Sequence, residues 1–486
     1  MRSEVSGADF VPGSKSVVPR VELPNVIIQF EAVSGRWSSE LSNLASLIEG
    51  LSAFGVQACF FAYGRTAREI KEANNVLQEA AKQARTSLPD LVFMTERTIK
   101  VSMLYALTSC GGTFHKTLLF HASEYDLVGR SAVENSIEFV ECSRNNQHIT
   151  PTFFIQHVAQ SHLRTYQQVK MELERPIVVG CIMRTARAHS LARQNLLHLQ
   201  VDGGVCYVPV DHDVAINDQQ STFDILLHKV SDWIVYNERK ADVNLALPSV
   251  FESLGNESIP WVDAADKTRP ICSRTEIHKI LSELKLEQGQ EENLSGSLVL
   301  PTTTLLEDNS KIEGRAPPLI IKSNAACGVS FSHKMVIVRH LDEGELAKHL
   351  ETCFGQYRDL VVQDYLPHDG YEMKVYCIGE EVHMFKRKVA ECLTDDLPPL
   401  YCFDSLELKS KNADEENYPI CDADKALLCD CAKRLRAKMN VKLFGFDALK
   451  VKGTTTIAII DINYFPSFKG IPEARSGVHK VVKQKL

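Results

Sequence analysis

Residues 443–464 read LFGFDALKVKGTTTIAIIDINY, two apolar stretches separated by a polar, glycine-containing segment. This pattern predicts an antiparallel hairpin, and a register symmetric about Thr454 would set Asp447 directly opposite Asp461. Asn463 lies two residues beyond Asp461, so both side chains leave the same face of the strand. The hairpin therefore gathers two carboxylates and one amide on one face of a sheet.

These three oxygen donors indicate a metal site. A carboxylate pair among apolar neighbours is costly to bury unless a cation neutralises it. Oxygen-only ligands suit Mg²⁺ held partly by substrate phosphates, and they do not suit Zn²⁺. The alternative is a surface carboxylate pair beside a turn, which the apolar character of IAIIDIN disfavours. We therefore expect Asp447, Asp461 and Asn463 to be metal ligands.

A second predicted hairpin, YEMKVYCIGEEVHMFKRKV at residues 371–389, is basic. If it turns at Gly379–Glu381, Lys374 and Arg387 are symmetric about the turn and become cross-strand neighbours. Two facing cations repel each other unless an anion lies between them. The hairpin therefore predicts an anion-binding surface.

Lys322 ends the apolar strand LIIKS and precedes a loop of small residues. Gly328 in this loop allows backbone N–H groups to approach phosphate oxygens closely. A lysine on an edge strand is more often a solubility device, which is the alternative for Lys322 taken alone. These cations and the acidic triad together argue for phosphoryl transfer.

The whole chain has an ordinary globular composition. Its 486 residues are 44% hydrophobic and 24% charged, which excludes collagen-like, low-complexity and wholly disordered classes. A net charge of −8 disfavours a general binder of nucleic acid or anionic membrane. There is no 18-residue apolar run and no apolar segment typical of a secretory signal near the start. We expect a cytoplasmic monomer, with a nuclear location also open.

The 14 cysteines are scattered and form no CxxC pair, which is typical of a reducing compartment. Cys429 and Cys431 are the closest pair and lie on a predicted helix. Residues two apart on a helix point away from each other, so we expect buried thiols there and no zinc site.

The chain divides into segments of different pattern. Residues 1–24 are poor in large apolar side chains and predict a flexible tail. Residues 25–172 alternate strand-like and helix-like stretches, including a helix at TIKVSMLYALTS, which indicates a parallel sheet. Its first strand ends in Gln29-Phe30-Glu31, without the nucleophilic aspartate of a phosphatase or a phosphate-binding glycine motif. A new strand begins after Arg175, and polar loops are expected at 286–297, 307–318 and 393–418.

The order of these features resembles the ATP-grasp fold. Three segments resemble the inositol 1,3,4-trisphosphate 5/6-kinase (inositol-tetrakisphosphate 1-kinase) family: HKVSD at 228–232, KSNAACGVSFSHKM at 322–335 and DINYFPSFKGIPE at 461–473. The resemblance covers about residues 175–486.

The resemblance implies an α/β protein with an ATP-grasp kinase core of three subdomains. An extra Rossmann-like, haloacid-dehalogenase-like (HAD-like) α/β domain precedes the core, as in a multidomain plant-type branch of the family. The implied parts are the tail 1–24, the accessory domain 25–172, and kinase subdomains 173–262 (N-terminal), 263–365 (central) and 366–486 (C-terminal, with the metal site).

The resemblance also implies ATP and two Mg²⁺ ions as cofactors and roles for named residues. Lys374 and Asp461 would be catalytic, and Asp447, Asp461 and Asn463 would hold the metal. The nucleotide-binding positions would be Arg269, Lys322, Gln363, Asp364, Tyr365, Leu366, Lys374, Arg387 and Ser405, with backbone groups of Tyr365 or Leu366 at the adenine. The positions binding the inositol phosphate would be Arg187, Lys229, Gly328, His333, Lys374, Asn463 and Ser467.

Three positions depart from the family pattern. Arg187 stands where the family usually has a lysine, Cys327 where it has a histidine, and Ser467 where it has a glycine. Arginine keeps the charge and can grip a phosphate bidentately, whereas Cys327 cannot supply a cation. The departures therefore bear on the choice of substrate more than on the fold.

The function implied is Mg-ATP-dependent phosphorylation of a hydroxyl of an inositol tris- or tetrakisphosphate, with phosphate-shuttling isomerase activity through ADP. One alternative is a carboxylate–amine ligase that uses the same nucleotide fold through an acyl phosphate. The other is a non-catalytic scaffold that binds nucleotide or inositol phosphate.

Overall fold

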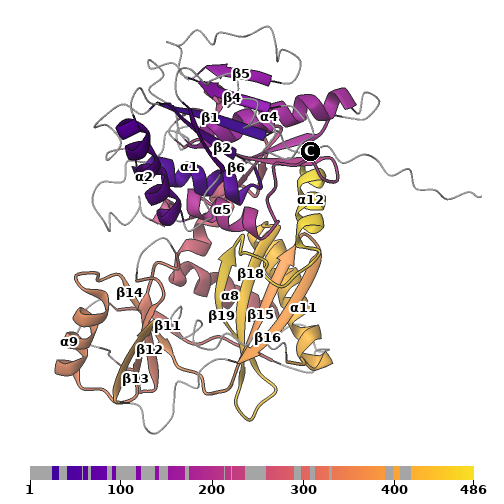
Figure 1. Cartoon of the computed structure of the whole chain (residues 1–486). Coiled ribbons are helices and arrows are strands. Elements are labelled where there is room, and N and C mark those ends of the chain that lie inside the picture. Colours follow the sequence, from indigo (N-terminus) through magenta and orange to yellow (C-terminus); the bar gives the residue numbers. More distant parts are fainter. Residues whose placement is uncertain are drawn as a thin grey trace, which may run out of the picture.

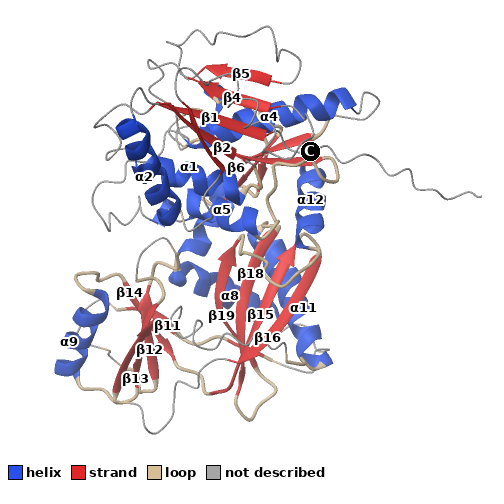
Figure 2. Ribbon diagram, in the orientation of Figure 1, coloured by secondary structure: helices blue, strands red, loops and turns tan. Residues whose placement is uncertain are grey.

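The structure is a computed structural model, shown in Figures 1 and 2. Its described strands form four sheets, of which three have five strands and one has four. It describes residues 25–31, 41–56, 58–63, 67–84, 90–94, 117–121, 137–141, 151–169, 175–212, 214–219, 222–231, 233–235, 259–288, 297–306, 312, 314–327, 331–388, 398–404 and 418–486. The tail 1–24, the predicted helix TIKVSMLYALTS and most of loop 393–418 lie outside these residues. Within the described part of that loop Leu400–Asp404 form a strand, so the prediction of a loop is wrong there. None of the helices within the described ranges is long and apolar enough to cross a membrane.

The N-terminal sheet has the strand order β3-β2-β1-β4-β5, and all of its pairings are parallel. Its elements are β1 (Asn25–Glu31), α1 (Leu41–Ala53), β2 (Ala58–Tyr63), α2 (Ala67–Gln83), β3 (Asp90–Met94), β4 (Thr117–His121), β5 (Ile137–Glu141) and α4 (Pro151–Val169). Parallel pairing follows the predicted alternation of strands and helices. That this region is a separate Rossmann-like or HAD-like domain stays a prediction.

The second sheet is also parallel and has the order β7-β6-β8-β9. Its strands and helices are β6 (Ile177–Ile182), α5 (Thr185–Arg193), β7 (Val205–Pro209), η2 (Ile216–Asp218), β8 (Ile225–His228) and β9 (Trp261–Val262). Nearly every residue of β6, β7 and β8 is buried, because helices cover both faces of such a sheet.

Helix α1 packs on α4 and α5, and α4 packs on β7 of the second sheet (Figure 1). A Cβ added to Gly50 of α1 would lie 3.0 Å from Ile155 of α4 and 3.1 Å from His189 of α5. Glu49 of α1 forms an ion pair with Arg193, and its carboxylate lies 3.7 Å from His189 Nδ1. The described helices of the N-terminal region therefore share one core with the second sheet.

The third sheet is antiparallel, with the order β11-β14-β12-β13-β17. Its elements are β11 (Thr303–Leu305), β12 (Leu319–Ser323), β13 (Lys334–Val338), α9 (Glu343–Phe354), β14 (Leu360–Asp364) and β17 (Leu400–Asp404). Helix α9 begins at Asp342, whose carboxylate accepts from the backbone N–H groups of Gly344 and Glu345.

Two cysteines of this third sheet form a disulfide that their spacing in the sequence did not indicate. It joins Cys353 of α9 to Cys402 of β17. Cys429 and Cys431 are both free, Cys431 is buried and Cys429 is exposed. The expectation of buried thiols is therefore confirmed for Cys431 and wrong for Cys429.

The fourth sheet carries the predicted hairpin and has the order β10-β19-β18-β15-β16. The elements of this part are α7 (Ala265–Thr268), η4 (Arg269–Cys272), α8 (Arg274–Gln288), β10 (Leu298–Val299), β15 (His368–Ile378), β16 (Glu381–Lys388), α11 (Asp422–Met439), β18 (Leu443–Val451), β19 (Ile457–Tyr464) and α12 (Ala474–Lys485). Helices α8 and α11 cover one face of this sheet, where Leu428, Leu435 and Val375 are fully buried. The opposite face is left for the polar residues described next.

Candidate functional site

Three neighbouring strands bring a lysine and two aspartates into one row. Asp447 on β18 lies opposite Asp461 on β19, and on its other side it lies opposite Lys374 on β15. Asn463 follows on β19, opposite Gly445. The register symmetric about Thr454 is thus confirmed at the acidic residues, whereas a bulge after Asp447 shifts it by one residue toward the turn.

The two carboxylates are partly neutralised by this chain. Lys374 Nζ donates to Asp447 Oδ1 at 2.8 Å. Burial raises the pKa of Asp461, and the Asp447 carboxylate adds to the rise, while Arg274, Lys322 and Lys374 act against it. The rise is due first to burial, and the two facing carboxylates are an arrangement that a bound cation would stabilise.

The donor set fits Mg²⁺. Among the described residues no three His, Cys, Asp or Glu side chains form a cluster that could hold a metal ion. Two carboxylates and the Asn463 amide are nevertheless hard oxygen donors on one sheet face, which is the ligand type of Mg²⁺ sites completed by phosphate and water. Asp447, Asp461 and Asn463 are therefore the residues that could hold it.

Lys322 faces these carboxylates from the third sheet. It lies on β12 between β13 and β14, so the alternative of an edge-strand lysine is wrong. Its Nζ donates to Gln363 Oε1 at 2.9 Å, and Gln363 Nε2 donates to Thr303 Oγ1 at 3.0 Å. Burial and Arg274 lower the pKa of Lys322 to about 8, although Asp461 and Asp447 raise it. Lys322 therefore interacts electrostatically with Asp447 and Asp461, which lie on a different sheet.

The predicted register of the basic hairpin is wrong. The turn contains two residues, Gly379 and Glu380, and Gly379 has a φ of +59°. Lys374 consequently lies opposite Phe385, and Arg387 lies opposite Glu372.

Glu372, which we had assigned no role, pairs with Arg387. Arg387 Nε donates to Glu372 Oε2 at 2.7 Å, and the Glu372 residue is only 7% exposed. The two cations that were expected to face each other therefore each have a carboxylate partner, Lys374 with Asp447 and Arg387 with Glu372.

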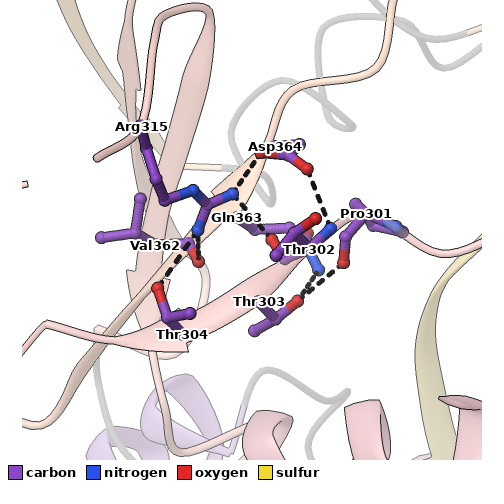
Figure 3. Close-up of polar contacts among 8 residues, drawn as sticks. All are labelled: Pro301, Thr302, Thr303, Thr304, Arg315, Val362, Gln363 and Asp364. Atoms are coloured by element: carbon purple, nitrogen blue, oxygen red, sulfur yellow. Dashed lines mark hydrogen bonds and ion pairs between the residues drawn. The ribbon is translucent and has the colours of Figure 1, made fainter. Parts of the chain in front are cut away.

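Asp364 and its neighbours form a rigid junction at the end of β14 (Figure 3). The Asp364 carboxylate accepts from the Arg315 guanidinium and, at 3.0 Å, from Thr302 N. Arg315 also donates to Val362 O and to Thr302 O, both at 2.8 Å. Burial acts to raise the pKa of Asp364, but hydrogen bonds from Arg315 and Thr302 outweigh it and lower the pKa. This carboxylate fastens β14 to β11 and the segment before β12.

The expected adenine segment follows this junction. Tyr365 N donates to Pro318 O at 3.1 Å, and the Tyr365 hydroxyl contacts His368 Nε2 at 3.3 Å. Leu366 is half-buried beside it. Contact of Gln363, Tyr365 and Leu366 with a nucleotide stays a prediction.

Arg274 is a residue of this site that sequence reasoning missed. Its guanidinium is buried and donates to Ser323 O at 2.5 Å, Ala325 O at 2.8 Å and Ser332 O at 3.2 Å. It thus holds both ends of the loop that follows Lys322, and its charge reaches Asp461. Arg269, the arginine we expected to contact nucleotide, is exposed on η4.

Two cations from the second sheet converge on the backbone after β19. Arg187 Nη2 donates to Phe465 O at 3.1 Å, and Lys229 Nζ donates to Tyr464 O. Phe465 and Phe468 have φ angles of +38° and +51°, a conformation that non-glycine residues rarely adopt. The segment that carries Asn463 and Ser467 is therefore held in a sharply turned form by the second sheet.

A buried carboxylate and a tyrosine hydroxyl connect the second sheet to β18 and β19. The Asp263 carboxylate accepts from Lys442 N at 2.8 Å and Leu443 N at 3.1 Å, at the start of β18. Tyr464 Oη donates to Val262 O and accepts from Asp263 N, both at 3.1 Å. Burial raises the pKa of Asp263 to about 6 and lowers that of its neighbour His228 to about 4. The relative positions of Lys229 and β19 are thereby fixed.

The remaining expected residues are less closely connected to this site. His333 is half-buried just before β13, and Cys327 is half-buried after Ala326. Gly328 and Ser405 lie outside the described residues. Whether any of these residues binds phosphate stays a prediction.

Comparison with known proteins agrees with this geometry. Residues 297–480 match the inositol 1,3,4-trisphosphate 5/6-kinase ATP-grasp domain. The family resemblance is confirmed. The mixed α/β core of the chain accordingly has the ATP-grasp fold.

Curated relatives carry the same family name. Inositol-tetrakisphosphate 1-kinase 3 of Glycine max is 26% identical over 312 residues, covering 62% of this chain and 82% of the relative. Inositol-tetrakisphosphate 1-kinase 2 of Oryza sativa subsp. indica is 28% identical over 316 residues, covering 61% and 82%. Inositol-tetrakisphosphate 1-kinase 6 of Oryza sativa subsp. japonica is 24% identical over 325 residues, covering 61% of this chain but 57% of the relative. This chain thus matches little more than half the length of that relative.

Among solved structures, D-alanine–D-alanine ligase from Bacillus anthracis shares 14% identity with a TM-score of 0.42. The similarity covers 64% of this chain and 97% of the ligase. A score of this size adds nothing to the assignment.

Proposed function

We propose that the protein transfers the γ-phosphoryl group of Mg-ATP to a hydroxyl of an inositol tris- or tetrakisphosphate. The observation that carries the proposal is the facing pair Asp447 and Asp461, bordered by Lys374 on one strand and opposed by Lys322 from another sheet. Phosphoryl transfer requires this combination of carboxylates and cations, because it depends on positioning and charge neutralisation.

In the proposed reaction the acceptor oxygen forms a bond to the γ-phosphorus while the bond to the β–γ bridging oxygen breaks. ADP leaves, and the hydroxyl proton passes to solvent. Bound Mg²⁺ would supply charge neutralisation and orientation of the phosphate oxygens. Asp447, Asp461 and Asn463 would hold two such ions, and Asp461 would also orient the acceptor hydroxyl. Lys322 and Lys374 would offset the charge that develops on the transferring group.

On the nucleotide side the proposal assigns the adenine to the segment Gln363–Leu366 and the phosphates to Lys322, with Arg274 holding the adjoining loop. Arg269, Arg387 and Ser405 remain proposed nucleotide contacts. On the acceptor side it assigns the phosphates to Arg187, Lys229, His333 and Lys374, with Gly328, Asn463 and Ser467 beside them. Arg187 and Lys229 support this assignment because they meet at the backbone next to Asn463.

The proposal is tested by incubating the protein with Mg-ATP and a panel of inositol tris- and tetrakisphosphate isomers, and separating the products by chromatography. We expect one phosphate gained per ADP formed. Incubation of the product with ADP should return isomers that differ from the starting one if the phosphate is shuttled. ATP binding without consumption of any isomer would refute the proposal in favour of a scaffold. A hydroxamate formed with hydroxylamine would instead indicate a ligase.

A further inference from the structure

A glutamine from the N-terminal region reaches the second sheet at the end of β7. Gln156 lies on α4 and is 1% exposed. Its Nε2 donates to Pro209 O at 2.9 Å and to Gln219 Oε1 at 2.7 Å. Both acceptors belong to the second sheet or to the loop that follows β7, so this side chain joins two parts of the molecule that are far apart in sequence.

Gln219 in turn closes that loop, whose described residues 210–212 and 214–219 are here called the β7 loop. Its Oε1 also accepts from Asp211 N at 2.9 Å. Its Nε2 donates to Asp211 O at 2.8 Å and to Val214 O at 2.7 Å. The Gln219 side-chain amide therefore satisfies backbone groups of the loop that have no partner in a helix or strand. Gln156 donates to this amide from α4.

The β7 loop lies at the edge of the sheet that carries the expected acceptor cations. In a parallel sheet the carboxyl ends of all strands meet at one edge. Arg187 follows β6 at this edge and Lys229 follows β8. Val210 N donates to Cys181 O of β6 at 3.0 Å.

The loop also reaches the segment after β8. The ring of His212 packs against that of Trp233, with centroids 4.7 Å apart. Because β6 lies between β7 and β8, the loop spans the end of β6, next to the start of α5. It therefore borders the space between the two cations.

We propose that the N-terminal region takes part in recognition of the polyphosphorylated acceptor, with Gln156 as a positioning residue that acts through the β7 loop. This inference rests on the proposed function. Removing the Gln156 amide leaves the buried Pro209 carbonyl and the Gln219 amide each one hydrogen bond short. The loop then loses its defined position beside Arg187 and Lys229, while the nucleotide side, formed by the third and fourth sheets, is untouched.

The same helix supplies a matched control. His162 on α4 is also 1% exposed, and its Nε2 accepts from Val201 N at 3.1 Å. Val201 precedes β7, so this bond lies at the amino end of the strand, away from the site. The two side chains make buried hydrogen bonds from one helix to opposite ends of one strand.

The test compares Gln156→Leu with His162→Leu in the full chain. For Gln156→Leu we expect the KM for the inositol phosphate to rise about 5- to 20-fold, while the KM for ATP changes less than about twofold. For His162→Leu we expect both KM values to stay at the wild-type level, with a comparable loss of thermal stability. An unchanged acceptor KM in Gln156→Leu, or an equal rise in both variants, would overturn the inference.

A second measurement does not depend on turnover. Hydrogen exchange of the Asp211 amide should quicken in Gln156→Leu and stay slow in His162→Leu. If the wild-type protein phosphorylates no isomer, the proposed function fails by itself. The inference is then decided by this exchange together with calorimetric affinity for inositol 1,3,4-trisphosphate, which Gln156→Leu should weaken and His162→Leu should not. Equal exchange or equal affinity in the two variants would refute it.

Discussion

The hairpins β18–β19 and β15–β16 are neighbours in one sheet, yet they place their charges in opposite ways. In β18–β19 like charges face each other, Asp447 opposite Asp461. In β15–β16 unlike charges face each other, Glu372 opposite Arg387. The first arrangement costs free energy unless a cation arrives from elsewhere, and the second is neutral by itself.

The difference indicates that the facing aspartates are suited to bind a cation, whereas the Glu372–Arg387 pair is stable without one. Lys374 belongs to the second hairpin but pairs with Asp447 of the first, so it connects the two arrangements. Burial raises the pKa of Asp461 and the facing Asp447 carboxylate adds to the rise, and a bound cation would relieve this interaction. The following predictions test this contrast.

The largest effect is expected for Asp461→Asn. Removing one of two facing carboxylates should reduce single-turnover phosphoryl transfer by about 10³-fold, because an ion ligand and a charge are lost together. Thermal stability should stay equal or rise, because the repulsion with Asp447 disappears.

Asp424→Asn is the matched control for this variant. Asp424 is also a buried carboxylate, but it pairs with Lys450 of β18 at 2.7 Å. This variant should lose stability and keep its rate of transfer. A rate equal to that of wild type in Asp461→Asn would contradict the contrast between the hairpins.

The second-largest effect is expected for the ion pair of Glu372 and Arg387, whose charges cancel. Glu372→Gln leaves the Arg387 guanidinium without its carboxylate, and we expect the free energy of unfolding in urea to fall by about 2–3 kcal/mol. The value lies below that of a fully buried pair because the Arg387 side chain is 29% exposed. The double variant Glu372→Gln/Arg387→Gln should recover part of the loss. A large loss of turnover with no loss of stability would instead make this pair part of the catalytic machinery.

The third prediction concerns pH and the support of the second hairpin by α12. His479 of α12 stacks on Tyr207 with ring centroids 5.5 Å apart, and Gly477 packs against Ile378 at the end of β15. Burial, followed by Arg475, lowers the pKa of His479 from 6.5 to about 4, while Asp202 acts to raise it and Lys483 to lower it. The unfolded chain therefore binds more protons between these values, and stability falls as pH drops through that window.

We expect His479→Phe to remove this contribution. Between pH 7 and pH 5 the wild-type protein should lose about 2 kcal/mol more free energy of unfolding than the variant, as measured by urea unfolding. The comparison cancels the opposite contribution of Asp263, whose raised pKa makes stability fall as pH rises from 3.8 to about 6. Parallel pH curves for the two proteins would show that His479 is not buried in its neutral form.

The smallest effect compares the two turns. Gly379 and Gly453 both have positive φ, +59° and +71°. A left-handed conformation costs an alanine about 1–2 kcal/mol at either position. A Cβ on Gly379 would also lie 3.1 Å from Val481 of α12, whereas a Cβ on Gly453 would meet nothing within 4 Å. Gly379→Ala should therefore lower the midpoint of thermal unfolding more than Gly453→Ala, and equal shifts would show that α12 does not support the second hairpin.

Much of the site could be predicted because the chemistry is local in the sequence. The alternation of IAIIDIN and the central turn predicted that Asp447 faces Asp461, and the end of LIIKS identified Lys322. The register predicted for the basic hairpin was wrong because it also depends on one local feature, the position of the turn. Pairing of Lys374 with Arg387 needs a turn centred between Glu380 and Glu381, whereas the observed turn is centred between Gly379 and Glu380. Arg387 therefore lies two positions further along its partner strand, opposite Glu372.

Other contacts had no sequence signal at all. Arg274 holds a loop that lies fifty residues or so further along, and Gln156 holds the β7 loop through Gln219. Polar side chains of this kind look like ordinary helix residues, because their partners are backbone carbonyls and amides that every residue has. The pairing of Cys353 with Cys402 was hidden for a similar reason, since the spacing of two cysteines does not reveal their distance.

The amino-acid sequence alone determined most of the strands, the hairpin at residues 443–464 and the oxygen donors on one of its faces, because hydrophobic alternation and turn residues act over a few positions. Only the tertiary structure decided which charged side chains lie close to one another. Lys322 reaches the aspartates from another sheet, and Arg187 and Lys229 reach the backbone after Asn463 from a third. These contacts depend on how whole sheets pack, and packing is a property of the complete buried core rather than of any one segment.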